Sequence, residues 1–320
     1  MINLPYYPGC TLKQRSSHLE SSAIAAMEKL GVRLSEIDPW TCCGAVPPPS
    51  SERIMNLIAP VRMLRALRDS GENRLVTICD FCYNVLKRAN HSMRTDDLRR
   101  KRVNAFLREN EPVRDYLPEE EPYGLPDYSG EVRVYHLMEY IRDEIGYERL
   151  SKEVSGRLEG MPIASYYGCV MLRPRKEIEL DDPENPTIME AFVSALHATP
   201  VPYPYRTECC GSYLSVSAPD ASSRLAAKIL GSARDHGAKG VVVSCPLCFY
   251  NLESRQEQIA RSSPGFKPMP VIFFTQLLAI ALGIDDPDVL GFGMHRTSLE
   301  GLLGASAIGA ASGSGREKDR

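Results

Sequence analysis

Ten cysteines are the residues of this 320-residue chain whose spacing points most directly to chemistry. They form two sets with one order: a single Cys, an adjacent Cys-Cys-Gly, and then a Cys-x-x-Cys. The gaps hold 31 and 35 residues in the first set and 39 and 34 in the second, which indicates an internal duplication. The first set is Cys10, Cys42, Cys43, Cys79 and Cys82, and the second is Cys169, Cys209, Cys210, Cys245 and Cys248.

The number of thiols in each set favours a metal cluster over the simpler alternatives. A Cys-x-x-Cys alone could be half of a zinc site, a thioredoxin-like redox pair or a pair of cluster ligands. The redox pair would leave three cysteines of each set unexplained, and a structural zinc ion takes only four ligands. Adjacent cysteines form a tight chelate ring on one small ion, whereas a multi-iron cluster lets their sulfurs reach different irons. We therefore expect an iron–sulfur cluster in each half, and zinc in one half stays open.

Other residues recur beside the cysteines. Gly44 and Gly211 follow the double cysteines, where a turn needs positive φ and where backbone N–H groups could reach the sulfides of a cluster. Paired tyrosines precede the first cysteine of each set, and we expect them to pack around the cluster, with proton donation to a departing thiolate as the alternative. These pairs are Tyr6 with Tyr7 and Tyr166 with Tyr167. The six histidines show no metal-ligand spacing and are predicted to be surface or core residues.

Composition narrows the class of protein. A hydrophobic fraction of 43% and a charged fraction of 25% are those of a soluble globular protein. The net charge of −3 argues against nucleic acid or an anionic membrane surface as the main partner. The first residues lack a secretory signal and no run reaches 18 apolar residues, so we expect a cytoplasmic chain without direct membrane insertion. Disulfides are rare in a reducing compartment, which again favours metal ligands.

The surrounding sequence predicts the elements that position the cysteines. Short β-branched runs at 74–79 and 240–245 stop at each Cys-x-x-Cys and lead into helical patterns at 84–93 and 251–259. Each half then closes with a strand and an amphipathic helix, over 132–145 and 271–282. Alternating strands and helices predict an α/β fold with mainly parallel sheets, in two duplicated Rossmann-like domains, with the cysteines at the carboxyl ends of strands.

The chain divides into two predicted domains and a tail. Residues 1–155 are expected to form the N-terminal domain with the first cluster, and residues 156–290 the C-terminal domain with the second. Residues 291–320 are predicted to be a mostly disordered tail, because the end of the chain is rich in Gly and Ser. A charged insert at 94–128 distinguishes the first half and is predicted to be a solvated helix and loop. The alternative for this insert is a docking surface for a partner subunit.

With these residues assembled, nearly the whole chain resembles the two CCG domains of the B subunit of heterodisulfide reductase. The motifs that carry the resemblance are Tyr7-Pro8-Gly9-Cys10, Cys42-Cys43-Gly44, Cys79-Asp80-Phe81-Cys82-Tyr83, Asp182-Pro183-Glu184-Asn185-Pro186 and Cys245-Pro246-Leu247-Cys248-Phe249. The resemblance implies two non-cubane 4Fe–4S clusters, one held by each cysteine set, in domains related by pseudo-twofold symmetry with the clusters at the interface. It also implies a disulfide substrate between the clusters, each of which supplies one electron and an iron that captures one sulfur.

The resemblance implies a role and partners as well. The expected role is the catalytic subunit of a complex that reduces a disulfide to two thiols. No Cys-x-x-Cys-x-x-Cys ferredoxin run is present, so electrons are expected from a flavin-containing A subunit through a ferredoxin-like C subunit. An alternative is electron transfer from a dehydrogenase toward quinone, because CCG domains also resemble parts of glycolate oxidase, anaerobic glycerol-3-phosphate dehydrogenase and some succinate dehydrogenases. A structural metal-binding scaffold without chemistry is a third hypothesis.

Overall fold

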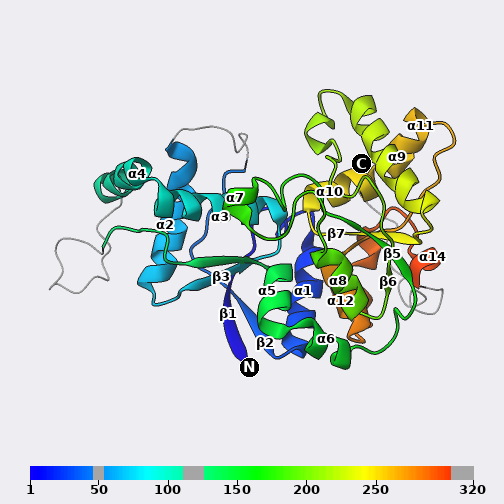
Figure 1. The fold of residues 1–320 in the computed structure, drawn as a ribbon, viewed down its shortest axis with the longest axis horizontal. Coiled ribbons are helices and arrows are strands. Elements are labelled where there is room, and N and C mark those ends of the chain that lie inside the picture. The colour runs from blue at the N-terminus through cyan, green and yellow to red at the C-terminus, as the bar shows by residue number, and fades with distance from the viewer. Residues whose placement is uncertain (46–53, 111–125, 304–320) are drawn as a thin grey trace.

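The computed structural model describes residues 1–45, 54–110 and 126–303 and contains two separate sheets, in which every strand pair is parallel (Figure 1). The strands of the first sheet are β1 (Ile2–Tyr7), β2 (Val32–Glu36), β3 (Arg74–Thr77) and β4 (Arg133–His136). The strands of the second sheet are β5 (Pro162–Tyr166), β6 (Thr199–Pro200), β7 (Gly240–Val243) and β8 (Val271–Phe273).

The two sheets repeat one topology. Their strand orders are β2-β1-β3-β4 and β6-β5-β7-β8, which are the same order in the two halves. In each sheet the chain leaves the second strand and returns on the other side of the first, so a topological switch point lies between β1 and β3 and between β5 and β7. Open α/β sheets hold their ligands at the carboxyl ends of strands beside such points. The prediction of two duplicated α/β units is therefore confirmed.

Helices connect the strands and cover the sheets. In the first half they are α1 (Ser17–Lys29), α2 (Met55–Asp69), α3 (Asp80–Thr95), α4 (Asp97–Asn110), α5 (Leu137–Tyr140), the π-helical turn η1 (Ile141–Ile145) and α6 (Tyr147–Glu153). Those of the second half are α7 (Arg175–Ile178), α8 (Ile188–Ala195), the 3₁₀ turn η2 (Ser212–Leu214), α9 (Pro219–Asp235), α10 (Pro246–Phe249), the π-helical turn η3 (Tyr250–Ser254), α11 (Gln256–Ser262) and α12 (Phe274–Ala281). The chain continues through α13 (Pro287–Leu290), the 3₁₀ turn η4 (Phe292–Met294) and α14 (Glu300–Leu303).

Burial explains the strands and helices that flank each Cys-x-x-Cys. All four residues of β7 are buried, as expected for a central parallel strand covered on both faces. Helix α3 begins directly after Cys79 and turns its apolar residues inward, as its amphipathic pattern predicts. Helix α12 is buried on all sides because it packs against both the sheet and α1.

Helix α1 joins the two halves. It follows Cys10 in the first half but packs lengthwise on α12 of the second, and the two helices lie side by side in the middle of the molecule (Figure 1). The hydroxyls of Ser22 and Thr275 lie 2.7 Å apart, and the Thr275 hydroxyl donates to the carbonyl of Leu19 at 3.0 Å. Ser21 donates to the carbonyl of Val289 at 2.6 Å. The halves therefore share one continuous core.

The insert and the tail are described in part. Helix α4 confirms the predicted helix of the insert, and residues 111–125 of the insert lie outside the described residues. The first part of the predicted tail is folded, because the side chains of Leu299 and Leu302 are buried, and Leu302 lies against Gly240 of β7. Residues 304–320 lie outside the described residues, and the domain limits at residues 155 and 156 stay a prediction. No helix in the described ranges combines the length and the apolar character needed to cross a membrane.

Candidate metal centres

The carboxyl ends of the central strands carry the cysteines, as predicted. Cys10 follows β1 and Cys79 follows β3, and in the second half Cys169 follows β5 and Cys245 follows β7. The second cysteine of each Cys-x-x-Cys lies in the first turn of the next helix, α3 or α10.

The structure brings the sulfurs of each set close together. In the first set, the Sγ atoms of Cys10 and Cys42 lie 3.7 Å apart, and those of Cys43 and Cys82 lie 3.6 Å apart. In the second set, the Sγ atoms of Cys210 and Cys248 lie 3.7 Å apart. All ten thiols are free. Cys10 and Cys42 are exposed, Cys169 and Cys209 are half-buried, and the other six are buried, so each set opens to the surface on one side.

In both sets, the two thiols of a hydrogen-bonded pair differ in pKa. The pKa of Cys43 is lowered to about 7 by a hydrogen bond from the Cys82 thiol, and the pKa of Cys209 to about 6 by one from the Cys169 thiol. Hydrogen bonds to these partners raise the pKa of both Cys82 and Cys169. Some thiols of each set are therefore ready to become thiolates, but ionising all five in a buried site needs a positive group to compensate the charge.

Gly44 and Gly211 adopt the positive φ that the sequence predicts, 78° in both cases. The N–H of Gly211 donates to Sγ of Cys209 at 3.4 Å, and the N–H of Gly44 donates to Cys42 in the same way. These N–H groups thus reach the cysteine sulfurs themselves, and donation to the sulfides of a cluster stays a prediction. At Gly211 a Cβ would also lie 2.8 Å from Cδ1 of Leu225 on α9, but that side chain is partly exposed, so the positive φ is the stronger reason for glycine there.

Two further glycines lie close to cysteine sulfurs. A Cβ on Gly9 would lie 2.7 Å from Sγ of Cys82, and a Cβ on Gly168 would lie 3.1 Å from Sγ of Cys248. Both have positive φ, 76° and 65°. The glycine before the first cysteine of each set therefore keeps space beside the last sulfur of that set.

The structure shows which tyrosines of the two halves are equivalent. Tyr7 donates to the carbonyl of Thr41 at 2.8 Å, and Tyr166 donates to the carbonyl of Glu208 at 2.7 Å, each just before a double cysteine. Tyr7 and Tyr166 are thus the equivalent pair, whereas Tyr167 bonds to the carboxylate of Glu190 instead. Because both hydroxyls are bound to backbone carbonyls, the structure favours the packing role over proton donation.

The donor sets fit iron–sulfur clusters. Each set presents five sulfurs, backbone N–H donors to sulfur, and a glycine cradle that a Cβ would fill. Thiolates are the usual ligands of such clusters, and N–H donors to sulfur tune them. Among the described residues, no three His, Cys, Asp or Glu side chains are arranged to hold a single metal ion.

The N-terminal part of α3 connects the two cysteine sets. The Asp80 carboxylate accepts a hydrogen bond from Ser244, the residue before Cys245, at 3.0 Å. The amide of Asn84 donates at 2.7 Å to the carbonyl of Val170, the residue after Cys169. Burial raises the pKa of Cys245 to about 11, and negative charge on Asp80 and Cys79 acts in the same direction. The two Cys-x-x-Cys motifs therefore face each other.

The contact between Asp80 and Ser244 was not predicted from the sequence. Asp80 has no counterpart in the second half, where Pro246 occupies the same motif position, and this asymmetry was the available signal. The Asp80 side chain is fully buried, and Nε2 of His136 lies 3.2 Å from its Oδ1 and 3.0 Å from the carbonyl oxygen of Ile78. His136 is thus a core residue, as predicted, with a polar partner next to a cysteine.

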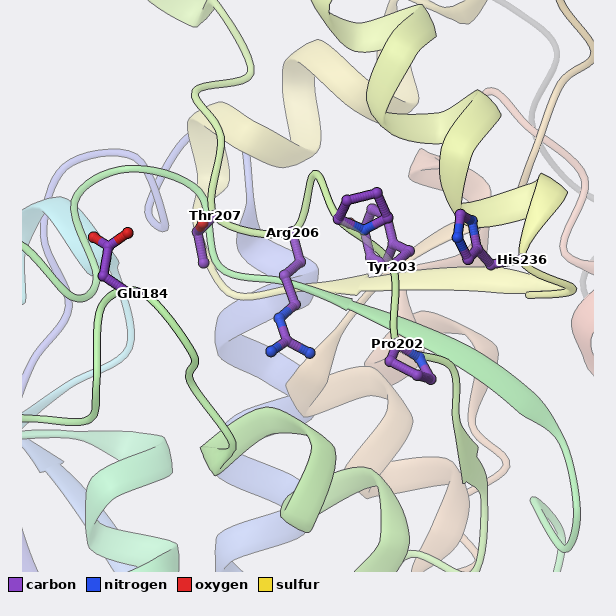
Figure 2. Close-up of a pocket in the computed structure, with 7 residues that line it drawn as sticks. Glu184, Pro202, Tyr203, Arg206, Thr207 and His236 are labelled. Carbon is purple, nitrogen blue, oxygen red and sulfur yellow. The ribbon is translucent and has the colours of Figure 1, made fainter.

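A pocket of about 380 Å³ lies beside the second set but contains none of its cysteines. Figure 2 shows Tyr203 and Arg206 on the loop that leads toward Cys209, with Glu184 and His236 on either side. The guanidinium of Arg206 is held by the Glu190 carboxylate at 3.2 Å and the Asn185 side-chain oxygen at 2.6 Å. Its charge is therefore engaged within the protein.

Comparison with known proteins places these features in a family. Residues 4–87 and 163–253 match the family model of the cysteine-rich domain, CCG. The 8-methylmenaquinol:fumarate reductase membrane anchor subunit of Wolinella succinogenes is 30% identical over 87% of this chain and 92% of its own length. The B subunit of the ferredoxin:CoB–CoM heterodisulfide reductase of Methanosarcina mazei is 25% identical over 91% of this chain and 92% of its own.

Two further comparisons, one of sequence and one of structure, agree with this family and this fold. A protein of Archaeoglobus profundus, named for its likeness to the B subunit of heterodisulfide reductase, is 25% identical over 91% of this chain and 94% of its own. The crystal structure of a hypothetical protein from Helicobacter pylori shares the fold, with a TM-score of 0.70 and 14% identity over 92% of this chain and 52% of that one. The chain therefore belongs to the family of proteins with two CCG cysteine-rich domains, which includes the B subunit of heterodisulfide reductase.

Proposed function

We propose that this chain is the catalytic iron–sulfur subunit of a multi-subunit, heterodisulfide reductase-like complex. In this proposal residues 1–155 hold one non-cubane 4Fe–4S cluster through the first cysteine set, and residues 156–290 hold a second through the other set. When bound, the clusters would supply one electron each, and cleavage of a disulfide to two thiols consumes two electrons and two protons. The reductant is a one-electron donor of the iron–sulfur class, expected to be a ferredoxin-like C subunit fed by a flavin-containing A subunit, in the cytoplasm.

The single observation that carries the proposal is the contact between the two cysteine sets. The Asp80–Ser244 hydrogen bond ties the residue after Cys79 to the residue before Cys245. The two sets are therefore close neighbours, which supports a two-electron reaction shared by two one-electron centres. The residues of the chain act by holding the sulfurs in place, since Tyr7 and Tyr166 fix the loops before the double cysteines. The exposed faces of Cys10 and Cys42 leave the first set accessible.

A second candidate function rests on a different observation. The relative with 30% identity is named as the membrane anchor subunit of an 8-methylmenaquinol:fumarate reductase. In this alternative the same two centres pass electrons between a dehydrogenase and quinone. The two candidates share the cysteine ligands and differ in the substrate.

Two measurements on the anaerobically purified protein, with the subunits that accompany it, test the proposal. Iron, acid-labile sulfide and zinc are quantified first: about four irons and four sulfides for each cysteine set support two clusters, and one zinc in place of four irons would mean a structural half. Turnover is then measured with reduced viologen as donor, against a panel of disulfides that includes the CoB–CoM heterodisulfide, and against a menaquinone analogue. Reduction of a disulfide supports the proposal, and reduction of the quinone alone would replace it with the second candidate.

A further inference from the structure

Tyr213 lies where the two cysteine sets meet, after the double cysteine of the second set and against Phe81 of the first. It lies on η2, the 3₁₀ turn that follows Cys209-Cys210-Gly211. Its side chain is 51% exposed, unlike the buried tyrosines that precede the first cysteines. Partial burial raises its pKa to about 12, and negative charge on Cys169, Cys245 and Cys209 adds to that rise. Tyr213 thus stands three residues after Cys210, on the turn that follows the double cysteine of the second set.

The ring of Tyr213 also contacts the first set. Its edge packs against Phe81, with ring centroids 5.8 Å apart and an interplanar angle of 74°. Phe81 lies between Cys79 and Cys82 and is 7% exposed, so it is fixed by the ligand motif on both sides. An edge-to-face pair of this kind holds a ring in one orientation. One side of the Tyr213 ring is thus in contact with the first set, while about half of the side chain remains exposed.

We propose that Tyr213 is a substrate-contacting residue, whose exposed ring receives the sulfur and alkyl groups of a disulfide that bridges the two sets, while Phe81 positions that ring. This inference rests on the disulfide-reducing function proposed above. Sulfur makes favourable contacts with aromatic rings, and an aromatic side chain buries a large apolar area when a ligand covers it. A substrate that reaches both sets from solvent meets this ring at their junction, so the ring contributes to substrate affinity.

The variants Tyr213→Phe, Tyr213→Leu and Tyr213→Ala separate the ring from the hydroxyl. Tyr213→Phe keeps the ring and should change the KM for the disulfide by less than about twofold. Tyr213→Leu and Tyr213→Ala remove the ring and should raise KM about tenfold, the scale of one aromatic contact, with kcat less affected. The matched control is Tyr250→Ala, because Tyr250 is 50% exposed in the same half and has no ring contact with Phe81 among the described residues.

A binding readout accompanies the kinetics. Thiol product is titrated into oxidised protein and the change of the iron–sulfur EPR signal is followed; Tyr213→Leu should shift the half-saturating concentration about tenfold, as it shifts KM. The iron content of each variant shows whether it has folded. If Tyr213→Ala loses iron, the test rests on Tyr213→Leu, which keeps an apolar side chain against Phe81. If Tyr213→Leu behaves like Tyr250→Ala while the wild-type protein turns over, the inference is wrong and the proposed function stands. If the fully loaded wild-type protein reduces no disulfide and does not respond to thiol, the proposed function fails first.

Discussion

The hydroxyl of Ser244 donates a 3.0 Å hydrogen bond to Oδ2 of Asp80, and this bond crosses from one half of the chain to the other. Both side chains are buried, with 1% and 0% exposure. A buried carboxylate depends on its hydrogen-bond donors, because burial removes the water that would otherwise solvate it. This bond and the one from Asn84 to the carbonyl of Val170 are therefore polar contacts that help to set the relative position of the two cysteine sets.

Ser244→Ala should lower the free energy of unfolding by about 1–3 kcal/mol, because it leaves a buried carboxylate short of one donor. Denaturant unfolding of the anaerobic protein measures this. The matched control is Ser262→Ala, which removes an exposed Ser–Asp hydrogen bond of the same length, from Ser262 to Asp220 at 3.0 Å. The control should change stability by less than about 0.5 kcal/mol. Equal effects of the two substitutions would show that the junction between the halves is not held by this bond.

Single ligand substitutions should affect one half at a time. Cys210→Ala should remove roughly half of the bound iron and the signal of the second cluster, and should nearly abolish disulfide reduction, while much of the first cluster's signal remains. Cys43→Ala, the matching change in the first half, should remove the complementary signal. Iron analysis and EPR spectroscopy of both variants measure this. Full activity of the Cys210→Ala variant would rule out the two-cluster mechanism.

Gly9→Ala should cost both stability and iron. The new alanine would have a φ of 76°, and its Cβ would lie 2.7 Å from Sγ of Cys82 in the first cysteine set. Gly71→Ala is the matched control, since Gly71 has a φ of 87° and nothing within 4 Å of the new Cβ. Both variants should lose about 1–2 kcal/mol through backbone strain. Only Gly9→Ala should also lose iron from the first half. If Gly71→Ala lost iron as well, backbone strain rather than the contact with Cys82 would explain the loss.

Acid should weaken the protein through a buried histidine pair. Burial lowers the pKa of His18 to about 4 and that of His295 to about 3, where the charge of His18 contributes as well. The ring centroids lie 5.6 Å apart, and both ring nitrogens of His18 lack hydrogen-bond partners among the described residues. As the pH falls below about 6.5, these two histidines bind protons in the unfolded chain, whereas in the folded chain they stay neutral. This contribution to stability is therefore complete above pH 6.5 and is lost as the pH falls toward 4.

His18→Leu should flatten that dependence. Over the window from pH 6.5 to 4, the wild-type protein should lose roughly 3 kcal/mol through His18 alone, at about 1.4 kcal/mol per pH unit. Unfolding curves at several pH values measure the slope. His236→Leu is the control, because His236 is exposed at the end of α9. A slope that both variants leave unchanged would assign the acid sensitivity to other groups.

Local pattern was enough to predict the repeated elements. The runs before Cys79 and Cys245 end as buried strands β3 and β7, and the predicted closing pairs are β4 with α5 and β8 with α12. These features depend on residues close together in sequence, where hydrophobic period and turn chemistry decide the outcome. The resemblance carried by the cysteine motifs then identified the family.

Contacts between distant segments could not be predicted in this way. Tyr7 and Tyr166 both stand three residues before the first cysteine of their set, but their bonds to Thr41 and Glu208 join segments 34 and 42 residues apart. The Asp80–Ser244 bond spans 164 residues and requires knowledge of how the halves face each other. The folded start of the tail was missed for the same reason, since Leu302 is buried against Gly240 on a strand far away in sequence.

The position of α1 has a consequence for biosynthesis. This helix follows the first cysteine, yet its partner α12 lies at residues 274–281, near the end of the chain. When only the first half has been made, α12 does not yet exist, so the face of α1 that packs on it is exposed, and transiently exposed hydrophobic surface is prone to aggregation. We therefore expect the nascent N-terminal half to need protection by a chaperone until α12 has been made.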